Sequence, residues 1–198
     1  MKEKLTKLRK YLPWIATGLL VAAAFFLASQ QPVLARGEHY TITESGKEEY
    51  TVQLRNAQGE SVKRYVSKLG HRPEVEELEG GILEVRIPVA PEDWQGTYYD
   101  PTADQFSPTY NSPLGSGEGM VVLAEYGRGI NCIVVRDMMS GKTILAVECD
   151  FAPYPRLSEA VHGVAFPSAD AVEVTYEMGD DFTVITETFP LAGADAAS

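Results

Sequence analysis

The residues best suited to recognition chemistry are aromatic rings interleaved with carboxylates in the middle of the chain. Flat rings with a polar tip offer apolar contact area beside hydrogen-bonding groups, a combination that suits sugar or peptide ligands. Long irregular loops in a small β domain are also where binding residues usually lie. We therefore predict a ligand-binding surface made by Trp94, Tyr98, Tyr99, Asp100 and Tyr110. The alternative is that alternate rings pack into the core between strands.

Catalytic signatures are absent from the sequence. It contains no Gly-x-Ser-x-Gly elbow, no His-Glu-x-x-His pair, no phosphate-binding glycine loop and no EF-hand loop. The histidines at 39, 71 and 162 are too far apart for a local metal-binding motif. We therefore expect no catalytic residue, no metal ligand and no cofactor, and favour a non-enzymatic role. The alternative is an exported polysaccharide hydrolase or lyase in which Asp100 and Glu118 converge as acid and base.

The charge of the chain narrows the class of partner. Residues 36–198 carry 27 acidic and 12 basic residues. A domain this acidic is repelled by nucleic acid and by anionic lipid headgroups, so neither is an expected partner. An envelope protein or a carbohydrate is expected instead. Clusters at residues 74–79 and at Asp180-Asp181 leave calcium binding as an alternative to solvated charge.

The N-terminal segment carries an export signal. Five basic residues precede an uncharged stretch from Tyr11 to Ala35, whose centre from Leu12 to Ala28 is almost wholly apolar. A cleaved signal peptide would end at Val33-Leu34-Ala35, or less favourably at Ala28. A retained anchor needs roughly 20 apolar residues, which the uncharged flanks can supply. Either way the domain is expected to be extracytoplasmic, secreted or held at the cell membrane by one hydrophobic helix within residues 11–35.

The chain has two cysteines, Cys132 and Cys149, in two β-branched runs around Ser140-Gly141. A two-residue hairpin loop at Ser140-Gly141 would place the two cysteines opposite each other in a non-hydrogen-bonded pair, where side chains approach most closely. We therefore predict a cross-strand disulfide in an oxidising compartment. The alternative is two reduced cysteines that act as small apolar residues.

The remainder of the chain predicts an all-β fold. Short runs rich in Val, Ile, Tyr, Thr and Phe alternate with Gly, Asp, Asn, Ser and Pro, and helical patterning is almost absent. A strand–turn–strand pattern repeats, and its units begin near residues 40, 75, 121 and 163. These starts are 35 to 46 residues apart, within the range of β-propeller blades. The glycine-rich run at residues 115–119 predicts a flexible connection between units.

Two hairpins carry a resemblance to known repeats. The run from Tyr99 to Ser107 resembles the outer hairpin of kelch-type blades, and the run from Val135 to Lys142 resembles the corresponding hairpin of WD40 blades. The chain is also similar to small exported β-rich domains of bacterial proteins, a resemblance that implies compartment and fold but no activity.

These patterns predict one organisation for the chain. Residues 1–35 form a signal peptide or membrane anchor, residues 36–191 an extracytoplasmic β domain, and residues 192–198 a disordered tail. The domain consists of antiparallel meander repeats, either propeller-like or a β-sandwich, preceded by one N-terminal hydrophobic helix. The expected function is non-catalytic binding of a cell-surface ligand or partner protein. An accessory subunit of a larger envelope assembly is a third reading.

Overall fold

A computed structural model describes residues 31–68, 70–91, 93–127 and 130–191. It is all-β, with four antiparallel meander sheets and two short 3-10 helices in the described part. This confirms the predicted all-β fold of antiparallel meander repeats, whereas the predicted N-terminal hydrophobic helix lies almost wholly outside the described residues. The repeated sheets are consistent with propeller-like blades. Most of the predicted leader and the tail at residues 192–198 lie outside the described residues. No helix within the described ranges is long and apolar enough to cross a membrane.

The four sheets follow one another along the chain, and we name them A to D. Sheet A comprises β1 (Val33–Arg36), β2 (Tyr40–Gly46), β3 (Glu49–Arg55) and β4 (Ser61–Ser67). Sheet B comprises β5 (Glu74–Glu77), β6 (Leu83–Pro88), β7 (Trp94–Asp100) and β8 (Gln105–Asn111), with the 3-10 helix η1 (Glu79–Gly81) between β5 and β6. Each strand pairs with its sequence neighbour, so every connection is local.

The second half of the chain repeats this plan. Sheet C comprises β9 (Gly115–Gly117), β10 (Met120–Gly127), β11 (Ile130–Asp137) and β12 (Thr143–Glu148). After the 3-10 helix η2 (Leu157–Ala160), sheet D comprises β13 (Val161–Ser168), β14 (Ala171–Met178) and β15 (Thr183–Pro190). Alternation within strands sets the faces: in β14, Val172, Val174 and Tyr176 are buried, whereas the residues between them are partly exposed.

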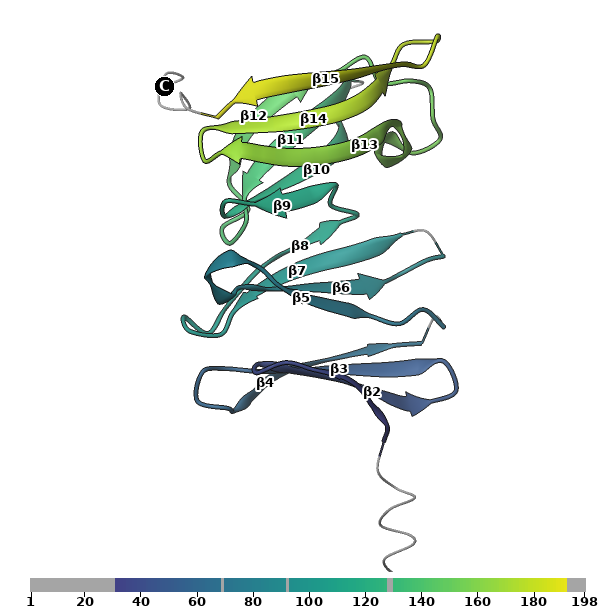
Figure 1. Ribbon diagram of the computed structural model, residues 1–198. Helices are drawn as coiled ribbons and strands as arrows, with labels where there is room; N and C mark the ends of the chain where they lie inside the picture. The colour runs from purple at the N-terminus through teal and green to yellow at the C-terminus, as the bar shows by residue number, and fades with distance from the viewer. Residues whose placement is uncertain (1–30, 69, 92, 128–129, 192–198) are drawn as a thin grey trace, which may run out of the picture.

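The sheets stack face to face, with sheet A and sheet D at opposite ends (Figure 1). Sheets A and B enclose Ile42, Val52, Leu54, Leu83, Val85 and Tyr99. Sheets B and C enclose Tyr98, Tyr110, Val121, Leu123 and Met138. Sheets C and D enclose Met120, Val122, Ile133, Val135, Val172, Val174 and Tyr176, together with Cys149, Phe151 and Ala160. The core is therefore three apolar layers between successive sheets.

The run at residues 115–119 does not form the expected flexible connection, because Gly115–Gly117 is strand β9, paired with β10. Its glycines allow sheet D to approach closely. A Cβ atom on Gly115 would lie 2.9 Å from Val164 Cβ, and one on Gly117 would lie 2.7 Å from Phe166 Cδ2. These glycines are thus packing residues, since any side chain there would push β13 away from β9.

The predicted disulfide is wrong, because Cys132 and Cys149 are both free. Cys132 lies opposite Glu148, one position away from the predicted pairing. The cause is the β11–β12 turn. Asp137 Oδ1 accepts hydrogen bonds from Ser140 N at 2.7 Å and Ser140 Oγ at 2.6 Å, and a register shift follows between Val135 and Arg136. The turn is longer than the assumed two residues, so every pair beyond it is displaced.

Candidate functional site

A cavity of about 540 Å³ lies beside the C/D core layer, and we call it the C/D pocket. It is lined by Tyr126, Asn131, Asp150, Phe151, Ala152, Pro153, Tyr154, Pro155, Leu157, Gly179 and Asp180. These residues come from three separate parts of the chain: the β10–β11 hairpin, the segment between β12 and β13, and the β14–β15 turn. Its volume is in the range of ligand-binding clefts.

Backbone hydrogen bonds fix the segment after β12 against sheet D. Phe151 forms an isolated antiparallel bridge with Met178. The N–H of Ala152 donates to the carbonyl of Glu177 at 2.9 Å, and the N–H of Gly179 donates to the carbonyl of Asp150 at 3.0 Å. One wall of the pocket is therefore held as an extension of the sheet rather than as a free loop.

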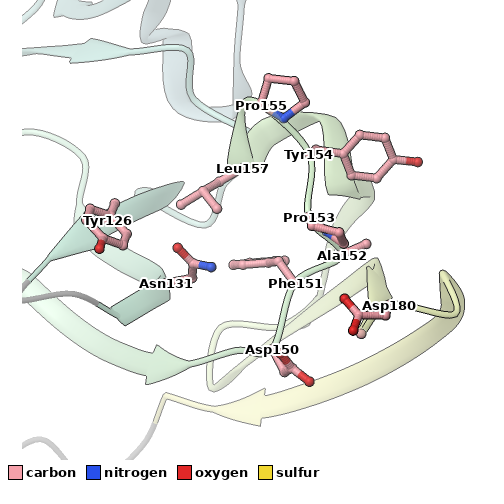
Figure 2. Close-up of a pocket in the computed structure, with 11 residues that line it drawn as sticks. Tyr126, Asn131, Asp150, Phe151, Ala152, Pro153, Tyr154, Pro155, Leu157 and Asp180 are labelled. Atoms are coloured by element: carbon pink, nitrogen blue, oxygen red, sulfur yellow. The ribbon is translucent and has the colours of Figure 1, made fainter.

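Aromatic side chains form the floor and rim of the C/D pocket. Phe151 is buried, and its ring meets the ring of Tyr176 edge-on at a centroid distance of 5.1 Å. Tyr126 is 72% exposed at the rim. Figure 2 shows Asn131, Phe151 and Leu157 pointing toward the middle of the cavity, whereas the ring of Tyr154 points away from it. The pocket thus combines a rigid apolar floor with an accessible ring.

Carboxylates gather at one side of the pocket. Asp150 and Asp180 belong to its lining. An ideal Cβ on Gly179 would lie 3.9 Å from Asp150 Oδ2 and 3.3 Å from Oδ1 of Asp181, which is not itself a lining residue, so the carboxylates of Asp150 and Asp181 lie close to this glycine. Among the lining residues that the structure describes there is no Lys, Arg or His. In the described part of the chain, no three His, Cys, Asp or Glu side chains are grouped closely enough to hold a metal ion. The chemistry offered is acidic and aromatic.

A polar network lies at the outer edge of the pocket. The hydroxyl of Tyr154 donates to Glu177 Oε2, and His162 Nε2 lies 2.9 Å from Glu177 Oε1. The Tyr154 hydrogen bond lowers the pKa of Glu177, and His162 adds to this effect. The same carboxylate raises the pKa of Tyr154. The ring of Tyr154 also meets Phe182 edge-on at 5.5 Å. The network fixes the Tyr154 side of the rim to β14.

Three of the residues predicted to bind a ligand lie in the core layers instead of on a surface. Tyr98 and Tyr99 are both 0% exposed and Tyr110 is 3% exposed. Because adjacent strand residues point to opposite faces, Tyr98 enters the B/C layer and Tyr99 the A/B layer. Burial raises the pKa of all three phenols. This is the alternative in which the rings pack between sheets.

The two remaining predicted residues lie at opposite ends of β7. Trp94 is half-buried beside a second cavity of about 480 Å³, and the guanidinium carbon of Arg86 lies 5.0 Å from its ring centroid. Asp100 Oδ1 accepts hydrogen bonds from the N–H groups of Thr102 and Ala103 in its own turn. The structure therefore does not bring the five predicted residues together, and ligand binding by Trp94 and Asp100 stays a prediction.

The carboxylates considered for an enzyme also lie in turns. Asp100 caps the β7–β8 turn, and Glu118 has a φ of 50° between β9 and β10. Neither residue lines the C/D pocket.

The sequence does not reveal the residues of the C/D pocket, for a physical reason. Asp180 and Asp181 were recognisable as a turn, but the run from Asp150 to Pro155 and the ring at Tyr126 have no spacing pattern that links them to it. Only the stacking of sheets C and D brings these segments together (Figure 2).

No protein-family model matches the chain, and no curated protein matches it.

Proposed function

We propose that the protein is an exported, non-catalytic binding module whose C/D pocket takes a cationic group from a cell-surface partner. The group we favour is a Lys or Arg side chain of a partner protein. The observation that carries the proposal is the composition of the pocket: aromatic rings and two carboxylates line a cavity of about 540 Å³, and its described lining residues include no Lys, Arg or His.

The aromatic part of the pocket suits a cation. An ammonium or guanidinium group is attracted to the face of an aromatic ring, and the attraction increases as water is excluded. Tyr126 supplies an accessible ring, and Phe151 supplies a buried apolar floor for the methylene stem of a long side chain. Carboxylates at Asp150 and Asp180 would pair with the charged end.

The net charge of the domain supports the same class of partner. The excess of acidic residues in 36–198 creates a negative field that increases the rate of encounter with a basic ligand. The lining residues of the C/D pocket share this sign, so the local and overall fields act together.

The proposal is tested by titrating the full chain with the peptide Gly-Gly-Arg-Gly-Gly in isothermal calorimetry at low salt. Binding is expected, and the double substitution D150N/D180N should weaken it at least tenfold. The matched control is E118Q, which removes an acidic charge outside the pocket and should leave the affinity within twofold. Absence of binding, or equal loss in D150N/D180N and E118Q, would overturn the proposal.

A further inference from the structure

The two end sheets of the stack each present one face that no other sheet covers. In the part of the chain that the structure describes, the buried clusters lie only at the A/B, B/C and C/D layers. Sheet A and sheet D lie at opposite ends of the stack, so the outer face of each points away from the molecule (Figure 1). The register of the strands determines which side chains lie on these two outer faces.

The outer face of sheet A is a surface of arginine and threonine. A cross-strand row runs through Arg36, Thr41, Gln53 and Arg64, one residue from each of the four strands. Arg55 lies on the same face, because its Nη1 donates to Thr41 Oγ1 at 3.0 Å. Arg64 Nη2 likewise donates to Thr51 Oγ1 at 3.3 Å. The arginines therefore lie over threonines of their own sheet.

These arginines have few acidic neighbours on their own face. Within β3, alternation places the carboxylate of Glu49 on the same face as Arg55. Glu49 lies at the hairpin end of the strand, and its Oε1 is 3.7 Å from Lys68 Nζ. No ion pair joins Arg36, Arg55 or Arg64 to a carboxylate of the described residues. The residues from 33 to 68 carry six bases and five acids, so sheet A is the one end of an acidic domain that is not negative.

The outer face of sheet D has the opposite charge. Residues 161–190 contain six acidic residues and no Lys or Arg, and two of these, Glu173 and Glu177, lie on the outer side of β14. Glu173 lies on the outer face opposite Thr188, and Thr175 hydrogen-bonds Thr186 across the same face at 2.9 Å. Glu177 lies at one end of this face, where Tyr154 and His162 hold it. Glu173 is thus the carboxylate best placed to accept a new partner.

Both outer faces also expose aliphatic side chains. On sheet A, Val33 and Val66 are 49% and 44% exposed and belong to one cross-strand row with Thr43 and Thr51. On sheet D, Val184 is 57% exposed and lies opposite Glu177. Each face therefore combines exposed aliphatic side chains with charge of one sign. Protein interfaces combine an apolar centre with a polar rim in a similar way.

We propose that the outer face of sheet D docks on the outer face of sheet A in a second copy of this chain. The contact would pair the arginines of one copy with Glu173 of the other and would continue the stack of sheets. Such a head-to-tail contact closes into a ring when the rotation allows it and otherwise extends as a filament. An anionic surface such as phospholipid would account for the arginine face but not for its acidic counterpart at the other end.

Charge-reversal substitutions test whether the two outer faces dock on each other, with the purified full chain in mild detergent. Molar mass by light scattering and sedimentation velocity is expected to show association that weakens with salt. Variant R36E/R64E reverses the face of sheet A, and variant E173R/T188R reverses the face of sheet D. Each variant alone should be monomeric, with a dissociation constant at least tenfold higher. An equimolar mixture of the two should associate again, because the reversed faces complement each other.

The mixture distinguishes a docking contact from misfolding, since two unfolded variants would not restore association. The matched control is K47E with E118R, which changes charge in turns and should leave the molar mass unchanged. All variants share residues 1–30, so association through that segment would be unaffected by the face substitutions. The proposal would be overturned if the wild type were monomeric, or if it associated and neither charge reversal weakened the association. It would also be overturned if the wild type did not self-associate but bound anionic vesicles, and R36E/R64E abolished that binding.

Discussion

The hydroxyl of Tyr98 donates a 3.0 Å hydrogen bond to Oε1 of Glu84 in the layer between sheets B and C. Both residues are buried, with Glu84 1% and Tyr98 0% exposed. Arg86 Nη2 lies 2.6 Å from the other carboxylate oxygen of Glu84. A buried carboxylate is costly unless it is paired and hydrogen-bonded, so these two partners allow Glu84 to occupy the core.

Replacing Tyr98 with phenylalanine should therefore destabilise the fold. The substitution keeps the ring in the B/C layer but leaves Glu84 Oε1 without its donor, at a cost of about 1–3 kcal/mol. Urea unfolding followed by far-UV circular dichroism measures the difference. Tyr126→Phe is the control, because that residue is 72% exposed. A change in Y98F no larger than in Y126F would show that the hydrogen bond does not stabilise this layer.

The cysteines should behave as two free thiols. Alternation places Cys149 in the C/D core, whereas Cys132 precedes the core residue Ile133 and faces the other side of sheet C. Burial raises the pKa of the Cys149 thiol, which slows its alkylation further. Iodoacetamide should label Cys132 before Cys149 in the native protein and both after unfolding. A Cys132–Cys149 linked peptide in non-reducing mass spectrometry would contradict the structure.

The turn that displaces the cysteine register should contribute measurably to stability. Asp137 accepts hydrogen bonds from Ser140, and these lower the pKa of its carboxyl group. Asp137→Ala should lower the free energy of unfolding by about 1 kcal/mol, since it leaves the turn amide without its acceptor. Glu118→Ala, in the β9–β10 turn, serves as the comparison in thermal unfolding. Equal stability of the two variants would remove this role of Asp137.

The contribution of Glu177 should depend on pH. Its pKa is lowered in the folded state, so the stabilisation is present above the usual Glu pKa of about 4.3 and is lost as pH falls below it. The melting temperature of the wild type should exceed that of Glu177→Gln at pH 7, and the difference should shrink by pH 3. A difference that is constant from pH 7 to pH 3 would show that the carboxylate is not stabilised by its partners.

Strand β1 crosses the boundary after Ala35 that the leader pattern favoured. Leu34 and Ala35 pack against the A/B cluster, and Arg72 Nη2 donates to the carbonyl of Leu34 at 3.1 Å. A chain that begins at Arg36 should thus be less stable than one that begins at Gln31, by roughly 1–3 kcal/mol for the lost apolar burial. Chemical unfolding of the two chains checks this, and equal midpoints would show that β1 adds nothing to sheet A.

The strands were predictable because their local signals agree with the global fold. Alternation in residues 172–176 and turn residues at Ser45-Gly46 and Gly179-Asp180 mark hairpins that the structure contains. Strand β9 was not predictable because Gly-Ser-Gly has no β-propensity, although it pairs with β10 and packs closely against β13. Register at Cys132 was missed because a side-chain hydrogen bond from Ser140 to Asp137 sets the turn length.

The candidate site was not predictable in the same way. The sequence does not distinguish an aromatic strand residue that faces the core from one that faces solvent. Tyr98 and Tyr99 are adjacent in the sequence, yet they point into two different core layers. The rings and carboxylates at Tyr126, Asp150 and Asp180 are far apart in sequence and meet only after sheets C and D have stacked.

Binding of a cationic side chain in the C/D pocket can be observed by chemical-shift mapping, which locates the ligand residue by residue. Isotope-labelled full chain is titrated with Gly-Gly-Arg-Gly-Gly and followed by ¹H–¹⁵N correlation spectra. Saturable shifts are expected, confined to the neighbourhood of Tyr126, Asp150, Tyr154 and Asp180. Shifts centred on the Trp94 indole, or none at saturating peptide, would contradict it.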